Sequence, residues 1–124
     1  MDCAKAFSES PNKNIRLSVA TLALNVSCFL MKQEASLTKV TITGVGEKLI
    51  SLIQSMLSSG LYDNEATSRA FVALGTVLLI SNMREKVKAL DSKTNSITLL
   101  FKDVEKYGEK ATAVAKEIQL VLKS

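Results

Sequence analysis

The stretch from Glu65 to Ile80, EATSRAFVALGTVLLI, constrains the fold more than any other part of the chain. From position 70 onward, only Gly75 and Thr76 interrupt its apolar run. A helix that is apolar on all sides is buried by neighbours on several sides, and a membrane span needs roughly 20 apolar residues, more than this run contains. We therefore expect a central helix in a soluble, all-helical domain. Asp63 or Asn64 can cap its N-terminus with a side-chain oxygen.

A second long helix is predicted over residues 10–33, where Ser10 can act as the cap and Pro11 suits the first turn. Its apolar residues follow the 3.6-residue period on two faces. The first face contains Ile15, Val19, Leu22, Val26 and Phe29, and the second contains Leu17, Ala20, Leu24, Cys28 and Met31. Two apolar faces predict packing neighbours on two sides of this helix.

A polar stripe runs between these two faces and comprises Asn14, Ser18, Thr21 and Asn25. Steps of four, three and four residues place these side chains on one side of a helix. A half-buried Asn25 amide would need several hydrogen-bond partners. Two interpretations remain open: Asn25 is a core asparagine bonded to a neighbouring backbone, or it lines a groove and holds a peptide backbone.

Residues 34–46 are interpreted as a connecting loop, because a lone β-branched strand without a partner would be unstable. Gly44 and Gly46 within it lack the other residues of a nucleotide-binding motif and are expected to form a helix-entry turn. An amphipathic helix is predicted over residues 47–59, ended by Gly60.

The C-terminal third is predicted to contain three shorter helices over residues 83–90, 96–107 and 109–122, with a polar loop at 91–95. Lysines on the last of these are interpreted as a solvated face. The sum is an all-α fold of five or six helices, an armadillo-like α-solenoid fragment over residues 11–124 that follows a tail, or the end of a preceding helix, at residues 1–10. An irregular helix bundle is the structural alternative.

The composition argues against several classes of function. The 124 residues contain no histidine, which excludes His-based catalytic triads and the usual zinc sites. Acidic residues are scattered, so we expect no enzyme activity and no cofactor or metal. The net charge of +4 is mild, and aromatic residues make up only 5%, which argues against nucleic-acid binding. Cys3 and Cys28 are expected to be reduced thiols, and no secretion signal or membrane span is predicted.

Two motifs resemble a known family. NKNIRLSVATLALNVSCF at residues 12–29 and EATSRAFVALGTVLL at residues 65–79 are similar, in order and separation, to the C-terminal half of the PUL domain. This domain ends ubiquitin adaptors of the phospholipase-A2-activating-protein type and also occurs in plant proteins, so the resemblance suggests a plant PUL-domain protein. It implies an armadillo-like fold that covers only part of a full family domain.

The resemblance also implies a partner: the acidic, aromatic-bearing C-terminal tail of a valosin-containing-protein-type AAA ATPase, held in a basic concave groove. A tail-binding role carries over to Arg69, which stands at the arginine of the second motif. We infer a groove role for Asn25 and Thr21 from the polar stripe. The remaining residues of the expected peptide-binding site are Arg16, Asn14 and Thr76.

An arginine that emerges from a buried helix is well placed to bind a carboxylate with both nitrogens, although an ion pair between Arg69 and Glu65 one turn earlier is the structural alternative. A cytoplasmic or nuclear location is expected. The alternative function is a truncated structural repeat that has lost tail binding. Its uncapped first helix would expose an apolar face and form a homodimer.

Overall fold

The computed structural model describes residues 11–59, 63–95, 97–102 and 104–123, and these residues form helices and turns without a strand. The helices are α2 (Lys13–Lys32), α3 (Lys39–Ser58), α4 (Asn64–Leu78), α5 (Ser81–Thr94), the short 3-10 helices η1 (Thr98–Phe101) and η2 (Val104–Tyr107), and α6 (Glu109–Lys123). The all-α prediction is therefore confirmed.

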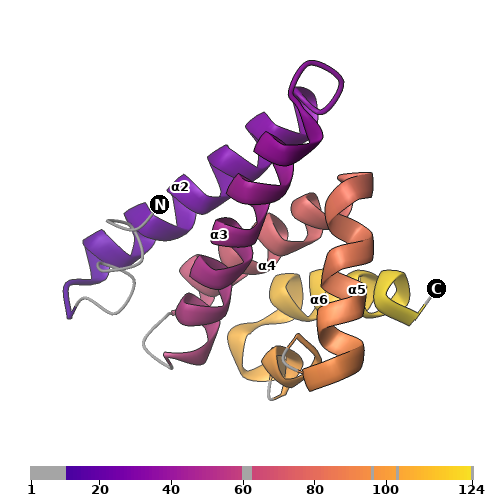
Figure 1. Cartoon of the computed structure of the whole chain (residues 1–124). Coiled ribbons are helices and arrows are strands. Elements are labelled where there is room, and N and C mark those ends of the chain that lie inside the picture. The colour runs from indigo at the N-terminus through magenta and orange to yellow at the C-terminus, as the bar shows by residue number, and fades with distance from the viewer. Residues whose placement is uncertain (1–10, 60–62, 96, 103, 124) are drawn as a thin grey trace.

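The helices form two layers. In one layer, α4 packs between α2 and α6, and in the other, α3 lies beside α5 (Figure 1). An ion pair of 3.3 Å between Lys13 and Asp63 joins the starts of α2 and α4. Gly75 of α4 faces Ile118 of α6. The three helices of the first layer thus run in the same direction, whereas α3 returns alongside α2 and α5 turns away from α4 at an angle of 111° (Figure 1).

This stacking of a first-layer helix followed by a second-layer helix gives a solenoid-like architecture. The first-layer helices begin at residues 13, 64 and 109. The second interval (109 − 64 = 45) matches the repeat length of about 40–47 residues in armadillo and HEAT proteins, and the first (64 − 13 = 51) is somewhat longer. The expected architecture is therefore confirmed at the level of an all-α solenoid-like fold.

The central role predicted for the stretch at 65–80 is also confirmed. Ten of the fifteen residues of α4 are buried, and its Phe71 ring stacks on Phe101 with the ring centroids 5.7 Å apart. The Asp63 carboxylate accepts a hydrogen bond of 2.9 Å from the Ala66 amide and caps the helix. This cap and this burial hold α4 firmly, and α4 is the helix that carries Arg69.

The loop predicted at residues 34–46 is wrong in its second half, because α3 already begins at Lys39. Thr38 caps this helix by accepting a hydrogen bond of 3.2 Å from the Thr41 amide. Gly46 is not a turn residue either. It lies buried within α3, and the Met83 side chain of α5 packs directly on it.

The helix predicted at residues 96–107 is also wrong, because the described residues there form two 3-10 turns. The Asp91 carboxylate accepts hydrogen bonds from the amides of Ile97 (3.1 Å) and Thr98 (2.8 Å), which holds the chain in a compact turn. Asp91 itself belongs to α5, which extends to Thr94 and replaces most of the loop predicted at 91–95.

The start of α2 differs slightly from the prediction. Its cap is Asn12, whose side-chain oxygen accepts hydrogen bonds from the amides of Asn14 (2.9 Å) and Ile15 (3.3 Å). The cap proposed at Ser10, the tail at residues 1–10 and the stop at Gly60 lie outside the described residues. Among the described helices, α2 alone is long and apolar enough to cross a membrane by length and composition. Within its apolar window 28% of the residues are buried, and both core helices of soluble proteins and N-terminal signal sequences pass the same test.

Candidate functional site

The Arg69 guanidinium bridges α4 and α2. One of its nitrogens donates a hydrogen bond of 2.6 Å to Thr21 Oγ1, and another donates one of 2.7 Å to Glu65 Oε1. The Arg69 side chain keeps 34% of its surface exposed, and that of Glu65 keeps 64%. The ion pair with Glu65 that was considered as an alternative is therefore present, but the guanidinium still reaches water.

Thr21 holds the guanidinium from the α2 side. Its hydroxyl donates a hydrogen bond of 3.0 Å to the Leu17 carbonyl, which leaves the oxygen to accept from Arg69. Because α2 and α4 run in parallel from the Lys13–Asp63 ion pair, position 21 of one helix comes to lie opposite position 69 of the other. Two predicted site residues 48 positions apart in sequence are thus in direct contact.

Charged groups continue from Arg69 toward the start of the two helices. Asp63 forms its ion pair with Lys13, and Arg16 is half-buried nearby. The pKa of Asp63 is lowered, first by the hydrogen bond from the Ala66 amide and then by the positive charges of Lys13 and Arg16, although partial burial opposes these effects. This edge therefore combines three cations with the two acids Asp63 and Glu65.

The two asparagines of the predicted site lie on the solvent side of α2. Asn14 precedes Thr21 by two helical turns and Asn25 follows it by one, and both are exposed. The prediction of a half-buried Asn25 is wrong. Helix α4 packs on a neighbouring side of α2 and leaves the Asn25 side chain exposed. Both amides remain open to a ligand that lies along the side of α2 next to Arg69.

Thr76 is buried two turns beyond Arg69 on α4, and its hydroxyl donates to the Val72 carbonyl at 2.8 Å. It lines a cavity of about 260 Å³ between α4 and α6. The remaining lining residues are mostly apolar: Val72, Gly75, Leu78, Leu79, Val114, Glu117, Ile118 and Val121. Thr76 therefore lines an apolar pocket. Among the described residues, no hydrogen bond joins it to Arg69.

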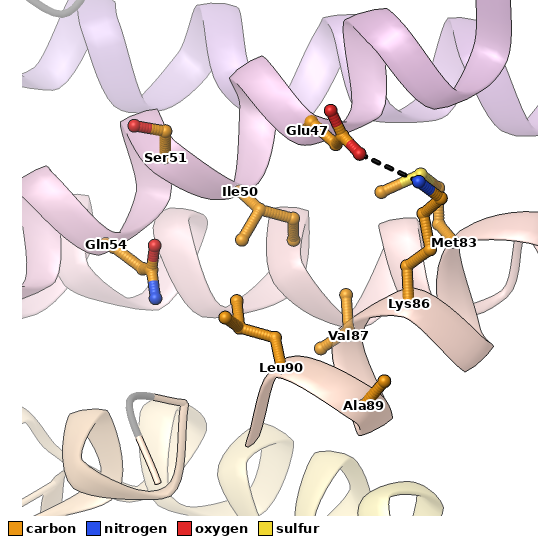
Figure 2. Close-up of a pocket in the computed structure, with 9 residues that line it drawn as sticks. All are labelled: Glu47, Ile50, Ser51, Gln54, Met83, Lys86, Val87, Ala89 and Leu90. Carbon is orange, nitrogen blue, oxygen red and sulfur yellow. Dashed lines mark hydrogen bonds and ion pairs between the residues drawn. The ribbon is translucent and has the colours of Figure 1, made fainter. Parts of the chain in front are cut away.

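A second cavity lies in the other layer, between α3 and α5 (Figure 2). It has a volume of about 370 Å³, an apolar wall that includes Ile50, Val87 and Leu90, and an ion pair of 2.8 Å between Glu47 and Lys86 at its edge. All the residues that line this cavity fall within the helices predicted over residues 47–59 and 83–90, but no prediction placed these two helices against one another.

The described residues contain no group of three or more cysteine or acidic side chains that could hold a metal ion. Cys28 is a free, half-buried thiol of α2, and Cys3 lies outside the described residues. At Arg69 the structure places a partly exposed guanidinium, hydrogen-bonded to Thr21 and Glu65, on the helix that also lines the apolar cavity at Thr76.

Comparison with known proteins gives two matches. The family model for the PUL domain matches residues 1–119, a range that includes both motifs quoted above. The ubiquitin homeostasis protein lub1 of Schizosaccharomyces pombe is 32% identical over 85 residues, which cover 67% of this chain but 11% of that protein. The chain thus corresponds to a small part of this relative. No solved structure matches it.

Proposed function

The chain belongs to the PUL domain family, and from this premise we propose that it is a non-catalytic protein-interaction module of the ubiquitin system. The yeast relative lub1 is named as a ubiquitin homeostasis protein. The proposed ligand is the acidic, aromatic-bearing C-terminal tail of a valosin-containing-protein-type AAA ATPase, and the proposed site lies along α2 and α4. A cytoplasmic or nuclear location and a plant origin fit this role and stay predictions.

The observation that carries this proposal is the contact between Arg69 and Thr21. Thr21 fixes one side of the guanidinium, so the side chain loses little freedom when it binds a carboxylate. The carboxylate already bound to Arg69 is that of Glu65, which is well exposed and occupies the place of a ligand's acid. An acidic tail would replace Glu65, and the exposed amides of Asn14 and Asn25 would hold its backbone.

The cavity at Thr76 is the proposed binding place for the aromatic side chain of the ligand. It lies about 10 Å along α4 from Arg69, since seven residues of helix rise about 10 Å. Its lining of Val72, Ile118 and Val121 would bury an apolar group. A peptide that carries a carboxylate and an aromatic side chain a few residues apart fits both features.

Fluorescence anisotropy with the labelled C-terminal peptide of the ATPase tests this function. We expect saturable binding by the wild type and a loss of about tenfold or more for Arg69→Ala, because hydrogen bonds to charged groups contribute about 1.5–3 kcal/mol. Lys116→Ala, which removes an exposed cation on α6, is the matched control and should bind as the wild type does. Absence of saturable binding, or equal binding by all three proteins, would refute the proposal.

A second candidate function is self-association, and a different observation favours it. Ile15, Leu22 and Phe29 of α2 form an exposed apolar stripe on the side of the helix away from α4. Within the described residues, α2 packs against both α4 and α3, as its two apolar faces predicted. Val19 of the first face is buried, whereas Ile15, Leu22 and Phe29 of that face are exposed. We propose that a second copy of the chain covers this stripe.

A further inference from the structure

The Arg69 guanidinium and the cavity at Thr76 belong to one row of side chains on α4. Arg69, Val72, Thr76 and Leu79 follow one another at steps of three, four and three residues, so they share one side of the helix. Val72, Thr76 and Leu79 line the cavity, which has a volume of about 260 Å³. A ligand with its carboxylate on Arg69 that continued along α4 toward Leu79 would therefore pass over this cavity.

The cavity offers an apolar surface. The Thr76 hydroxyl is already donated to the Val72 carbonyl at 2.8 Å, so it makes no demand on an occupant. Aliphatic side chains line the cavity from α6: Val114, Ile118 and Val121. Among the described residues that line it, Glu117 alone is charged, and its side chain is exposed. Such a lining favours an uncharged, apolar occupant.

The size and the charges of the site favour an aromatic side chain from an acidic peptide. An apolar cavity of about 150 Å³ can bind benzene, so the larger cavity here has room for an aromatic ring. The Glu117 carboxylate repels an acid at this end of the row, whereas Arg69 attracts one at the other end. The acid is thus directed toward the start of α4 and the ring toward its end.

Gly75 lies in the wall of this cavity, at a place where neither backbone nor packing calls for glycine. Gly108 has a positive φ of 100°, which favours glycine, whereas Gly75 has the helical backbone of α4. A Cβ atom at Gly46 would collide with the Met83 side chain. A Cβ atom at Gly75 would lie 3.6 and 3.7 Å from Cγ1 and Cδ1 of Ile118, in ordinary contact. The missing side chain therefore serves chiefly to leave space in the cavity.

We propose that Gly75 is the specificity-determining residue of this cavity, because the absence of a side chain there makes room for the aromatic side chain of the bound peptide. The ring packs against Gly75, between Val72 and Ile118. This inference rests on the proposed function and names the residue that selects the aromatic side chain of the ligand. A larger residue at position 75 fills the space and removes the preference for an aromatic ligand.

Fluorescence anisotropy with two labelled peptides tests this role. One peptide is the C-terminal peptide of the ATPase, and in the other its aromatic residue is replaced by alanine. The wild type should bind the aromatic peptide about tenfold or more tightly than the alanine peptide, because burial of an aromatic side chain is worth at least that factor. Gly75→Leu should bind both peptides about as the wild type binds the alanine peptide, and Gly75→Ala should show an intermediate preference.

Gly44→Ala is the matched control, since Gly44 is an exposed glycine of α3 and should leave the full preference in place. Gly75→Ala keeps the test decisive if Gly75→Leu does not fold, because its Cβ atom fits beside Ile118. An unchanged preference in the Gly75 variants, or equal weakening of both peptides, would overturn the inference and leave tail binding standing. A wild type that binds neither peptide would overturn the inference together with the proposed function.

Methyl NMR locates the ring independently of affinity. A bound aromatic ring shifts the signals of the methyl groups that it covers, so those of Ile118 and Val121 should move with the aromatic peptide and much less with the alanine peptide. Leu120 is exposed, does not line the cavity, and is the control. Shifts at Ile50 and Val87, which line the cavity between α3 and α5, would place the ring there and overturn the inference, as would unmoved signals at Ile118 and Val121.

Discussion

Replacement of Gly46 by alanine tests how closely α3 and α5 pack. A Cβ atom built at Gly46 would lie 2.8 Å from Cε and 2.9 Å from Cγ of Met83, and closer still to its sulfur atom. Gly44, two residues earlier on the same helix, is exposed and has no neighbouring atom within 4 Å of such a Cβ. The two positions share one helix and differ in their surroundings, so Gly44→Ala is the matched control.

The expected sizes follow from two opposing effects. Alanine stabilises a helix interior by about 1 kcal/mol relative to glycine, and Gly44→Ala should show this gain in full. Overpacking of a tight core costs about 1–3 kcal/mol, so Gly46→Ala should change the free energy of unfolding by between about 0 and −2 kcal/mol. The two variants should therefore differ by about 1–3 kcal/mol, near the low end if the flexible Met83 side chain moves aside.

Urea unfolding followed by circular dichroism gives these differences from the shift in midpoint. In a Met83→Ala background the obstruction is removed, so Gly46→Ala should then stabilise the chain about as much as Gly44→Ala does. Equal stabilisation by the two single variants would show that α5 does not approach α3 at this point. Two neutral variants would show that residues 39–46 are not helical.

Two further predictions concern the Arg69 surface. Asp63→Ala should lower the free energy of unfolding by about 1 kcal/mol at pH 7 through loss of the helix cap. Because folding lowers the pKa of Asp63, the ionised carboxylate stabilises the fold above about pH 4. The difference in free energy of unfolding between wild type and Asp63→Ala, measured by urea titration, should shrink as the pH falls through the lowered pKa. Glu65→Gln should raise affinity for the acidic peptide about twofold, opposite to Arg69→Ala, because an exposed i,i+4 ion pair is worth about 0.3–0.5 kcal/mol. Weaker binding by Glu65→Gln would show that Glu65 orients Arg69 and does not compete.

The long apolar helices were predictable from the sequence because their signals are local. The run after Glu65 leaves no polar face, which predicts burial, and α4 is the most enclosed helix of the fold. Arg69 and Thr21 were each predicted to line one peptide-binding groove, and the structure brings these two side chains into direct contact, although their binding role stays a prediction. The depth of Asn25 was misjudged, because periodicity does not show where a neighbouring helix stops, and Thr76 is buried at a cavity away from Arg69.

The helix boundaries were predicted wrongly where they depend on a contact with another part of the chain, or where a buried position has no apolar side chain. The buried stripe of α3 passes through Gly46, which has no side chain to continue the apolar pattern from Ile42 to Leu49. Beyond α5, the apolar residues at 97–104 have helical spacing. The carboxylate of Asp91 nevertheless takes up the amides of Ile97 and Thr98, and the chain turns before a longer helix can form.

The unequal ends of the α2–α4–α6 layer also set how far assembly can proceed. If the outer side of α6 were as apolar as that of α2, copies could stack head to tail into open fibres, since such contacts do not close on themselves. Exposed charges of both signs on α6, Lys110, Lys116 and Lys123 together with Glu109 and Glu117, make that side a poor match for the uncharged strip of a neighbour. If copies associate through α2 as proposed, growth should therefore stop at a pair.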